Sequence, residues 1–338
     1  MKYIYLHNTL YQAYGVKVIV NHLKGVLHDA VVTHQLDELP DDATVIPYGL
    51  LESVEVIRCR RFKLGLALMI DAYSLGEWSN FAITWRKSFI PLKYKARSLL
   101  KSIKYFFLEY WVLRKYDKIM LVSWGDKQYY EKCQFFKSYA NKIIIVPNGV
   151  NLPEPIPLRV RKANDKINVG CLSPWWGPSY YTLQFFLNEV WKKIKNKDNI
   201  KLIIAGRGIT PEKQEYMEKF ENVEVIGEVG DLKDFYSQID ISLITMLKKC
   251  GIINRVLDGF SYQVPVLCRE QSLLAFKDLP DCCYTYMDAD SFVKSVRRIV
   301  DFPEEANNKV SLAYNFVSDN HNWNLIYQRF ANYIEKKQ

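Results

Sequence analysis

A glycine, an arginine and an aspartate stand close together at Gly251, Arg255 and Asp258. Glycine lets a ligand approach the backbone, a helix N-terminus supplies N–H groups with partial positive charge, and arginine offers phosphate a planar fork of donors. Arg255 and Asp258 are three residues apart, so on a helix both side chains emerge on one face. The group therefore suits a bound nucleotide diphosphate. The alternative is an ordinary surface Arg–Asp pair on a crossover helix.

The residues around this group carry a resemblance that favours the first interpretation. The segment resembles the donor-site motif of the family 4 glycosyltransferases, which runs Glu-Gly, a basic residue, a second Glu, and then small-x-x-x-Gly-x-Pro-Val. By this resemblance Arg255 binds the pyrophosphate and Asp258 holds the ribose of the nucleotide. The donor-binding residues that it implies in this stretch are Cys250, Gly251, Ile252, Asn254, Arg255 and Asp258.

Three positions depart from the family pattern. Cys250 stands where the family has its first Glu, near the donor sugar, and a thiol does not reproduce that charge. Gln263 replaces the usual Gly, and Asp258 is one methylene shorter than Glu. These departures leave the identity of the sugar open, while nucleotide binding remains the expectation.

The resemblance extends over about residues 105 to 330. Glu109, the run from Tyr116 to Ser123 and the series from Val146 to Val150 are similar to the end of the family's acceptor domain. Trp323 fits a closing helix that crosses back to the first domain. The match implies the GT-B architecture, in which two Rossmann-like domains face a cleft.

Further donor-site candidates follow predicted strands of the second half. Arg207 lies between two glycines, where it meets either a phosphate or solvent, and Glu228-Val229 resembles the turn that holds the base through its backbone. Ser173 and Trp175 precede a glycine-proline pair. They either form the floor of a pocket for the sugar or base, or take part in domain packing.

Two candidates lie in the first half. Gly15 occupies the first strand-to-helix turn, where the family places a glycine-rich loop. Asp71 ends an apolar strand, so its carboxylate either orients an acceptor hydroxyl or the donor sugar, or caps the next turn. The catalytic residues that we expect are Asp71, Arg255 and Asp258.

No metal site and no cofactor are expected. The five histidines are scattered without metal-ligand spacing. Asp288-Ala289-Asp290 has the form of a metal-binding Asp-x-Asp, but it directly precedes an amphipathic segment, so its carboxylates are better explained as helix N-terminal caps.

Composition is that of a globular protein with two domains. The chain has 338 residues, 49% of them hydrophobic and 25% charged, and its start lacks an apolar run that would serve as a secretion signal. Its seven cysteines are scattered and include no Cys-x-x-Cys pair, which argues against a disulfide framework. We expect a cytoplasmic protein.

Most of the net charge of +9 is concentrated in residues 81–118. Ten basic residues face two acidic ones there, among many aromatic and aliphatic side chains. Such a stretch is typical of a helix on an anionic membrane surface, at the inner face of the membrane, and the alternative is a core helix with a basic polar face. No nucleic-acid-binding motif accompanies the charge.

Apolar runs alternate with helical patterns along the chain, which predicts an α/β fold with doubly wound parallel sheets. Expected strands in the second half include 200–205 and 223–226, and an expected helix spans 89–113 in the first. The prolines after Val146 mark a break. We place an acceptor-binding domain at 1–150, a linker at 151–165, a nucleotide-sugar-binding domain at 166–315 and a crossing helix at 316–338.

The expected function is transfer of a sugar from a nucleotide sugar to a glycan or lipid-linked acceptor in bacterial surface polysaccharide or glycolipid synthesis. By the resemblance, transfer retains the anomeric configuration and needs no metal. A nucleotide-sugar epimerase or phosphorylase of the same fold is one alternative. A catalytically inactive subunit that scaffolds a partner transferase is another, and Cys250 is the best support for it.

Overall fold

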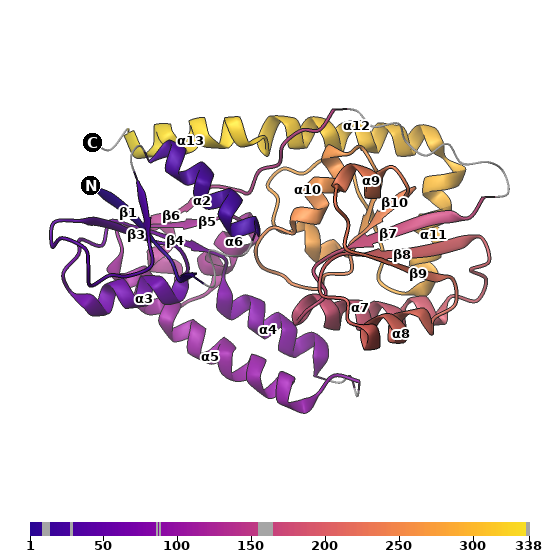
Figure 1. Cartoon of the computed structure of the whole chain (residues 1–338), viewed down its shortest axis with the longest axis horizontal. Coiled ribbons are helices and arrows are strands. Elements are labelled where there is room, and N and C mark those ends of the chain that lie inside the picture. The colour runs from indigo at the N-terminus through magenta and orange to yellow at the C-terminus, as the bar shows by residue number, and fades with distance from the viewer. Residues whose placement is uncertain (9–13, 28–29, 86, 88, 155–164, 336–338) are drawn as a thin grey trace.

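Parallel strands separated by helices build a sheet in each half of the chain (Figure 1). The computed structural model describes residues 1–8, 14–27, 30–85, 87, 89–154 and 165–335. Every strand pair among these residues is parallel, which is the arrangement expected when helical crossovers join successive strands.

The first half holds two three-stranded sheets in the orders β2-β1-β3 and β4-β5-β6. A parallel bridge between Tyr48 and Leu68 joins β3 to β4, so the strands run β2-β1-β3-β4-β5-β6. The strands are β1 (Lys2–Tyr5), β2 (Val31–Thr33), β3 (Thr44–Pro47), β4 (Leu66–Ile70), β5 (Lys118–Leu121) and β6 (Ile143–Ile145). The helices are α2 (Tyr14–Val26), α3 (Leu50–Cys59), α4 (Tyr73–Thr84), α5 (Leu92–Lys115), α6 (Trp124–Lys132) and the short η1 (Lys137–Lys142).

The second half is one six-stranded sheet in the order β12-β11-β10-β7-β8-β9. In chain order, β8 and β9 are added on one side of β7, and β10, β11 and β12 are added on its other side. The reversal places a topological switch point between β7 and β10. The strands are β7 (Ile167–Leu172), β8 (Ile200–Ala205), β9 (Val223–Gly227), β10 (Ile241–Leu243), β11 (Val266–Cys268) and β12 (Tyr284–Thr285). The helices are α7 (Pro178–Glu189), η2 (Trp191–Lys193), α8 (Pro211–Glu218), α9 (Leu232–Tyr236), α10 (Asn254–Ser261), η3 (Glu270–Leu273) and α11 (Ala289–Asp301).

Two C-terminal helices run along both halves (Figure 1). α12 (Pro303–Asn320) packs on the second half, and α13 (Trp323–Glu335) packs against α2 of the first. Trp323 stacks on His22 with ring centroids 4.8 Å apart, and Phe330 is buried in the same core as Ile4 of β1. The chain end therefore ties the two halves together.

The expected pair of Rossmann-like domains is confirmed, and the strands expected at 200–205 and 223–226 agree closely with β8 and β9. The sequence did not predict β2, α3 or α4. The expected helix at 89–113 corresponds to α5, which begins after Pro91 and continues to Lys115. Residues 155–164 of the expected linker lie outside the described residues, so the domain boundaries stay a prediction.

Asp288 caps α11 as expected. Its carboxylate accepts a hydrogen bond from the Ser291 amide, and the Ser291 side chain bonds back to the backbone of Asp288, which together form a capping box. Within the described part of the chain, no group of three or more His, Cys, Asp or Glu residues is arranged to hold a metal ion. None of the helices described is long and apolar enough to cross a membrane.

Candidate active site between the two sheets

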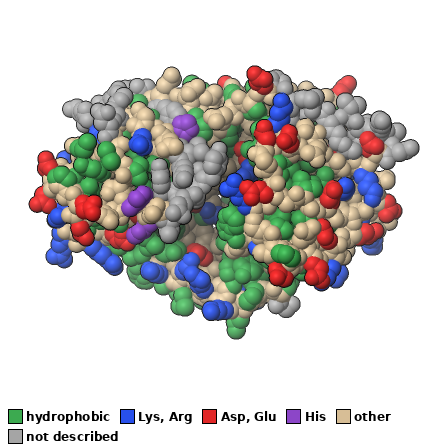
Figure 2. All heavy atoms as spheres, in the orientation of Figure 1, with side chains coloured by type: hydrophobic (Ala, Val, Ile, Leu, Met, Phe, Trp, Pro, Cys, Tyr) green, Lys and Arg blue, Asp and Glu red, His purple; other side chains and the backbone are tan. Residues whose placement is uncertain are grey.

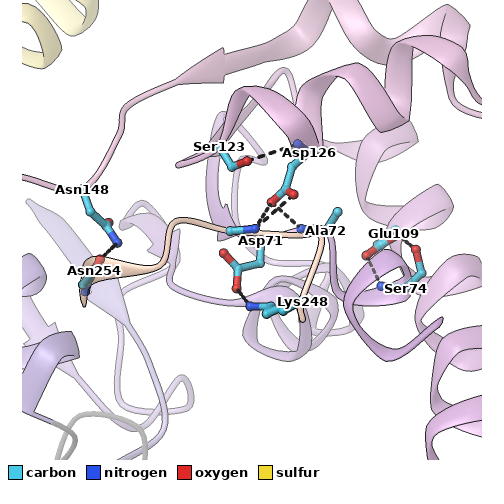
Figure 3. A network of polar contacts seen from close by, with 10 residues as sticks. Asp71, Ala72, Ser74, Glu109, Ser123, Asp126, Asn148, Lys248 and Asn254 are labelled. Carbon is cyan, nitrogen blue, oxygen red and sulfur yellow. Dashed lines mark hydrogen bonds and ion pairs between the residues drawn. The ribbon is translucent and has the colours of Figure 1, made fainter. Parts of the chain in front are cut away.

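Asp126 joins the two halves of the chain (Figure 3). It lies in the first turn of α6, directly after β5, and Ser123 caps that helix by accepting from the Asp126 amide. The buried carboxylate of Asp126 accepts hydrogen bonds from the Ala72 amide at 3.0 Å and from the Gly251 amide at 3.0 and 3.1 Å. One side chain of the first sheet thus satisfies backbone donors from both domains.

Asp71 lies beside this contact, at the carboxyl end of β4 where the sequence placed it. The residue before it, Ile70, has a φ of 72°, a left-handed conformation that costs a β-branched residue about 1 to 3 kcal/mol. Asp71 Oδ2 is 2.7 Å from Lys248 Nζ, which comes from the loop after β10 (Figure 3). The Asp71 carboxylate also lies so close to Gly251, whose φ is +67°, that any Cβ there would overlap it. Asp71 therefore contacts the second half of the chain.

Burial and neighbouring charge change the protonation of this cluster. Burial, and after it the charge of Asp71, raises the pKa of Asp126 well above its ordinary value. Burial alone would lower the pKa of Lys248, but the charge of Asp71 and its hydrogen bond, together with Cys250 and Asp126, outweigh burial, and the pKa lies well above its ordinary value. Lys248 is therefore a persistent cation beside the two carboxylates.

Cys250 is placed differently from the expectation that it faces the donor. Its side chain is buried in the core of the first domain, and a Cβ built on Gly76 of α4 would lie 2.6 Å from its Sγ. Burial raises the pKa of this thiol well above its usual range, so Cys250 remains an uncharged packing group. The residue docks the loop after β10 onto α4.

The Gly251 amide was expected to bind diphosphate, but it donates a hydrogen bond to the Asp126 carboxylate instead. Ile252 and Asn254 lie just beyond. Among the described residues, no group accepts a hydrogen bond from the amides of Ile252 to Arg255, which open α10. These amides remain available to a ligand, whereas the Gly251 amide does not.

Arg255 and Asp258 form the pair that their spacing predicted. Arg255 donates to Asp258 at 2.6 Å, and Asp258 is largely buried. Burial raises the pKa of Asp258, while the nearby arginine opposes that shift. The charge of Arg255 therefore favours the ionised form of Asp258. Asn254 accepts a hydrogen bond from Asn148 of the first half at 2.9 Å, beside the same helix start (Figure 3).

Arg207 and Glu228 come together from the loops after β8 and β9, with the Arg207 Nε 2.6 Å from a Glu228 carboxylate oxygen. The Arg207 side chain is 62% exposed, so it is free to turn toward a ligand. Gly206 has a φ of +129° and lies directly against the carbonyl of Ser173, which leaves no space for a Cβ. Glycine is therefore required where the loops after β7 and β8 meet. Val229 packs partly buried beside them.

Trp175 belongs to the core. It is fully buried, and its indole N–H donates to the Ala205 carbonyl at 2.8 Å, so the packing alternative holds for this residue. Its neighbour Trp176 is exposed and lies over Gly208. Ser173 remains at the carboxyl end of β7, at the switch point.

Three polar residues of this region were not assigned a role from the sequence. Asp126 and Lys248 each follow a buried strand, the position from which side chains of a parallel sheet reach a ligand. Lys213 donates to the carbonyls of Trp175 at 2.6 Å and Gly208 at 2.7 Å, so it holds the loops after β7 and β8 together. For Asp126 and Lys248, the position after a buried strand was the sequence feature that could have indicated a role.

Gly15 lies in the first turn of α2, and its surroundings lie outside the described residues. Viewed from the side shown in Figure 2, the molecule is hollowed between its two halves. Asp71, Arg207 and α10 each follow the carboxyl end of a strand. The arrangement can hold an anionic ligand on the second sheet and a second ligand on the first.

Comparison with known proteins agrees with this geometry. Residues 167–301 match the model of the family Glycosyl transferases group 1. The chain carries a group 1 glycosyltransferase domain. Over these residues, the match confirms the resemblance that the motif around Arg255 indicated. No curated protein matches the sequence.

Solved structures share the fold over nearly the whole length. Sucrose-phosphate synthase from Thermosynechococcus elongatus is 13% identical, with 99% of this chain and 98% of that chain covered and a TM-score of 0.71. HepE from Anabaena, in complex with UDP-glucose, is 11% identical, with 99% and 100% covered and a TM-score of 0.60. The two halves of the chain therefore share the GT-B fold with these proteins.

Proposed function

We propose that this glycosyltransferase moves a sugar from a nucleotide-sugar donor, bound at the second sheet, to an acceptor bound at the first. The observation that carries the proposal is the open start of α10, whose unpartnered amides lie next to Arg255 at the carboxyl edge of a doubly wound sheet. Backbone N–H groups with an adjacent arginine suit a diphosphate. Because HepE holds UDP-glucose, UDP-sugars are the first donors to test.

In the proposed reaction, negative charge develops on the leaving diphosphate. Arg207, Arg255 and the amides of Ile252 to Arg255 stabilise that charge electrostatically, without a metal ion. Asp258 keeps Arg255 oriented through their 2.6 Å contact and holds the ribose. Asp71 orients the acceptor hydroxyl or the donor sugar from the opposite side, and Lys248 holds its carboxylate in place through their 2.7 Å ion pair. Retention of anomeric configuration is part of the proposal.

Release of nucleoside diphosphate tests the proposal. The purified protein, incubated with UDP-, GDP- and ADP-sugars in turn, is expected to hydrolyse one class slowly without an acceptor, with and without EDTA. Arg207→Ala should reduce this release, because Arg207 meets the diphosphate, whereas Lys219→Ala removes another exposed, ion-paired cation and should not. Loss of the activity in EDTA would contradict metal independence.

The same assay separates the proposal from its alternatives. An inactive scaffolding subunit releases no diphosphate from any donor. Cys250, which stands in place of the family's Glu, packs in the core of the first domain. In this proposal its packing role explains the substitution without a loss of activity. An epimerase would convert the sugar while it remains bound to the nucleotide, which chromatography of the donor detects.

We further propose that the acceptor is lipid-linked and that α5 attaches the enzyme to an anionic membrane. The apolar residues Leu92, Leu100, Ile103 and Phe107 are exposed on α5. At 100° per residue they fall within an arc of about 80°, so they form one stripe. Exposed Lys93, Arg97 and Lys104 flank it, whereas Lys95 points inward and donates to two carbonyls of the first domain. An exposed apolar stripe with a basic border matches an anionic lipid surface.

Sedimentation with vesicles tests this attachment. The protein should sediment with phosphatidylglycerol vesicles and less with phosphatidylcholine, and added salt should weaken the association. Replacement of Leu100 and Phe107 by Ser should abolish it. Leu312→Ser, which changes an exposed leucine on α12, should leave it intact. Equal sedimentation of the two variants would refute the assignment of α5.

A further inference from the structure

A cavity of about 680 Å³ is lined by residues of both halves and by none from the loops after β8 and β9. Its walls come from α6 and β6 of the first domain, the loop at residues 275–278 of the second, and the junction between α12 and α13. The volume falls in the range of small-molecule sites. None of the donor-site residues assigned above lines it.

The floor of the cavity is apolar and aromatic. Phe276, Phe316 and Phe330 are all buried and line it, together with the isoleucines of β6, which is the edge strand of its sheet. Phe276 and Phe316 contact each other edge to face, with centroids 6.0 Å apart. Such a floor favours the apolar body of a ligand.

The rim is basic. Lys277 and Lys127 both lie over the ring of Trp124, at 4.8 and 5.3 Å from its centroid, and Arg329 also lines the cavity. Two like charges on one ring repel each other. Their nearest carboxylates are loosely placed, with Asp278 at 3.7 Å from Lys277 and Glu131 at 4.0 Å from Lys127. The lysine pair is therefore poorly neutralised within the described structure, and an anion between them would relieve the repulsion.

The one histidine in the wall does not add to this charge. His321 is buried, its Nδ1 is 2.8 Å from the Asn148 carbonyl, and burial lowers its pKa to about 4. It is neutral at physiological pH. The cations that a ligand would meet are therefore the two lysines and Arg329.

We propose that this cavity is a second ligand site of the enzyme, for a soluble small molecule with an apolar body and a phosphate or carboxylate head. The body rests on Phe276, Phe316 and Phe330, and the head lies between Lys127 and Lys277. The walls are joined across the domains by the hydrogen bond from the Trp124 amide to the Ala275 carbonyl at 3.0 Å. A bound molecule therefore touches both domains and the crossing helix at once.

Calorimetric titration with geranyl phosphate tests the proposal. Inorganic phosphate supplies the head alone and geraniol supplies the body alone, so geranyl phosphate should bind at one site with at least about tenfold higher affinity than either. Saturating UDP should leave this binding in place, because the donor loops are separate. Absence of saturable geranyl phosphate binding, or its displacement by UDP, overturns the proposal.

The variant Lys127→Gln with Lys277→Gln removes the charges and keeps side chains of similar length. Its affinity for geranyl phosphate should fall about tenfold or more, while geraniol binding should not change. If the double variant folds poorly, Lys277→Gln alone replaces it in the titration, because Lys277 is largely exposed and its substitution leaves the core unchanged. Lys219→Gln, a remote exposed cation, is the matched control. Equal binding by the double variant and this control would also overturn the proposal.

Discussion

At the scale of single residues, the candidate site combines a local pair on α10 with a contact between distant parts of the chain. The Arg255–Asp258 pair forms as its three-residue spacing predicted. Asp126 takes the Gly251 amide instead of leaving it for a ligand, and the two residues are 125 positions apart. No local pattern contains such a contact, because it depends on how the two sheets face each other.

Glu109 allows a residue-scale prediction about pH. It is fully buried and accepts from the amide and hydroxyl of Ser74 at 2.9 and 2.5 Å, but burial outweighs these bonds and raises its pKa to about 7. The folded protein thus keeps a proton on Glu109 that the unfolded chain loses at a lower pH. This group therefore stabilises the fold below pH 4.5, and its contribution is lost as the pH rises through about 7.

Glu109→Gln should remove that dependence. The difference in unfolding free energy between wild type and variant should shift in favour of the variant by on the order of 1 to 3 kcal/mol as the pH rises over this interval. Thermal unfolding at a series of pH values measures it. Parallel curves for the two proteins would show that Glu109 is ionised throughout.

At the scale of elements, the strands of the second half were predicted closely because buried parallel strands are short apolar runs between turn residues. The helix α4 was missed. Its segment has a glycine, two serines and little amphipathic contrast, and its inward face is built of small residues such as Ser74 and Gly76. Small residues are required there because the loop of Cys250 docks against them, which is a tertiary reason.

Gly76→Ala tests this docking. Alanine favours a helix by about 1 kcal/mol, yet the added methyl would lie 2.6 Å from Cys250 Sγ, and such overpacking costs about 1 to 3 kcal/mol. We expect a net loss of stability. Gly25→Ala on α2 is the control, because nothing lies within 4 Å of its added methyl, and it should stabilise the protein. In a Cys250→Ala background the cost of Gly76→Ala should largely disappear, and an unchanged cost would disprove the docking contact.

At the scale of the whole molecule, polar contacts join the two halves of the chain. The helix α13, which packs against α2, joins them a second time. The Asp71–Lys248, Asp126–Gly251 and Asn148–Asn254 contacts all cross between the halves. The GT-B architecture followed from strand and helix alternation together with the family resemblance. The path of the chain end was anticipated only at Trp323, since nothing local to α13 shows that it packs against α2.

The measurement that bears most directly on the account is calorimetric binding of UDP and UDP-glucose to the wild-type protein and to Arg207→Ala. The account predicts saturable binding of one nucleotide per chain, weakened in Arg207→Ala by about 1 to 3 kcal/mol with the thermal stability of the free protein unchanged. Lys219→Ala should bind as the wild type does. If UDP and UDP-glucose bind, but with the same affinity to Arg207→Ala, the donor does not lie at the second sheet as described. Failure of UDP, GDP, ADP and their sugars alike would contradict donor binding itself.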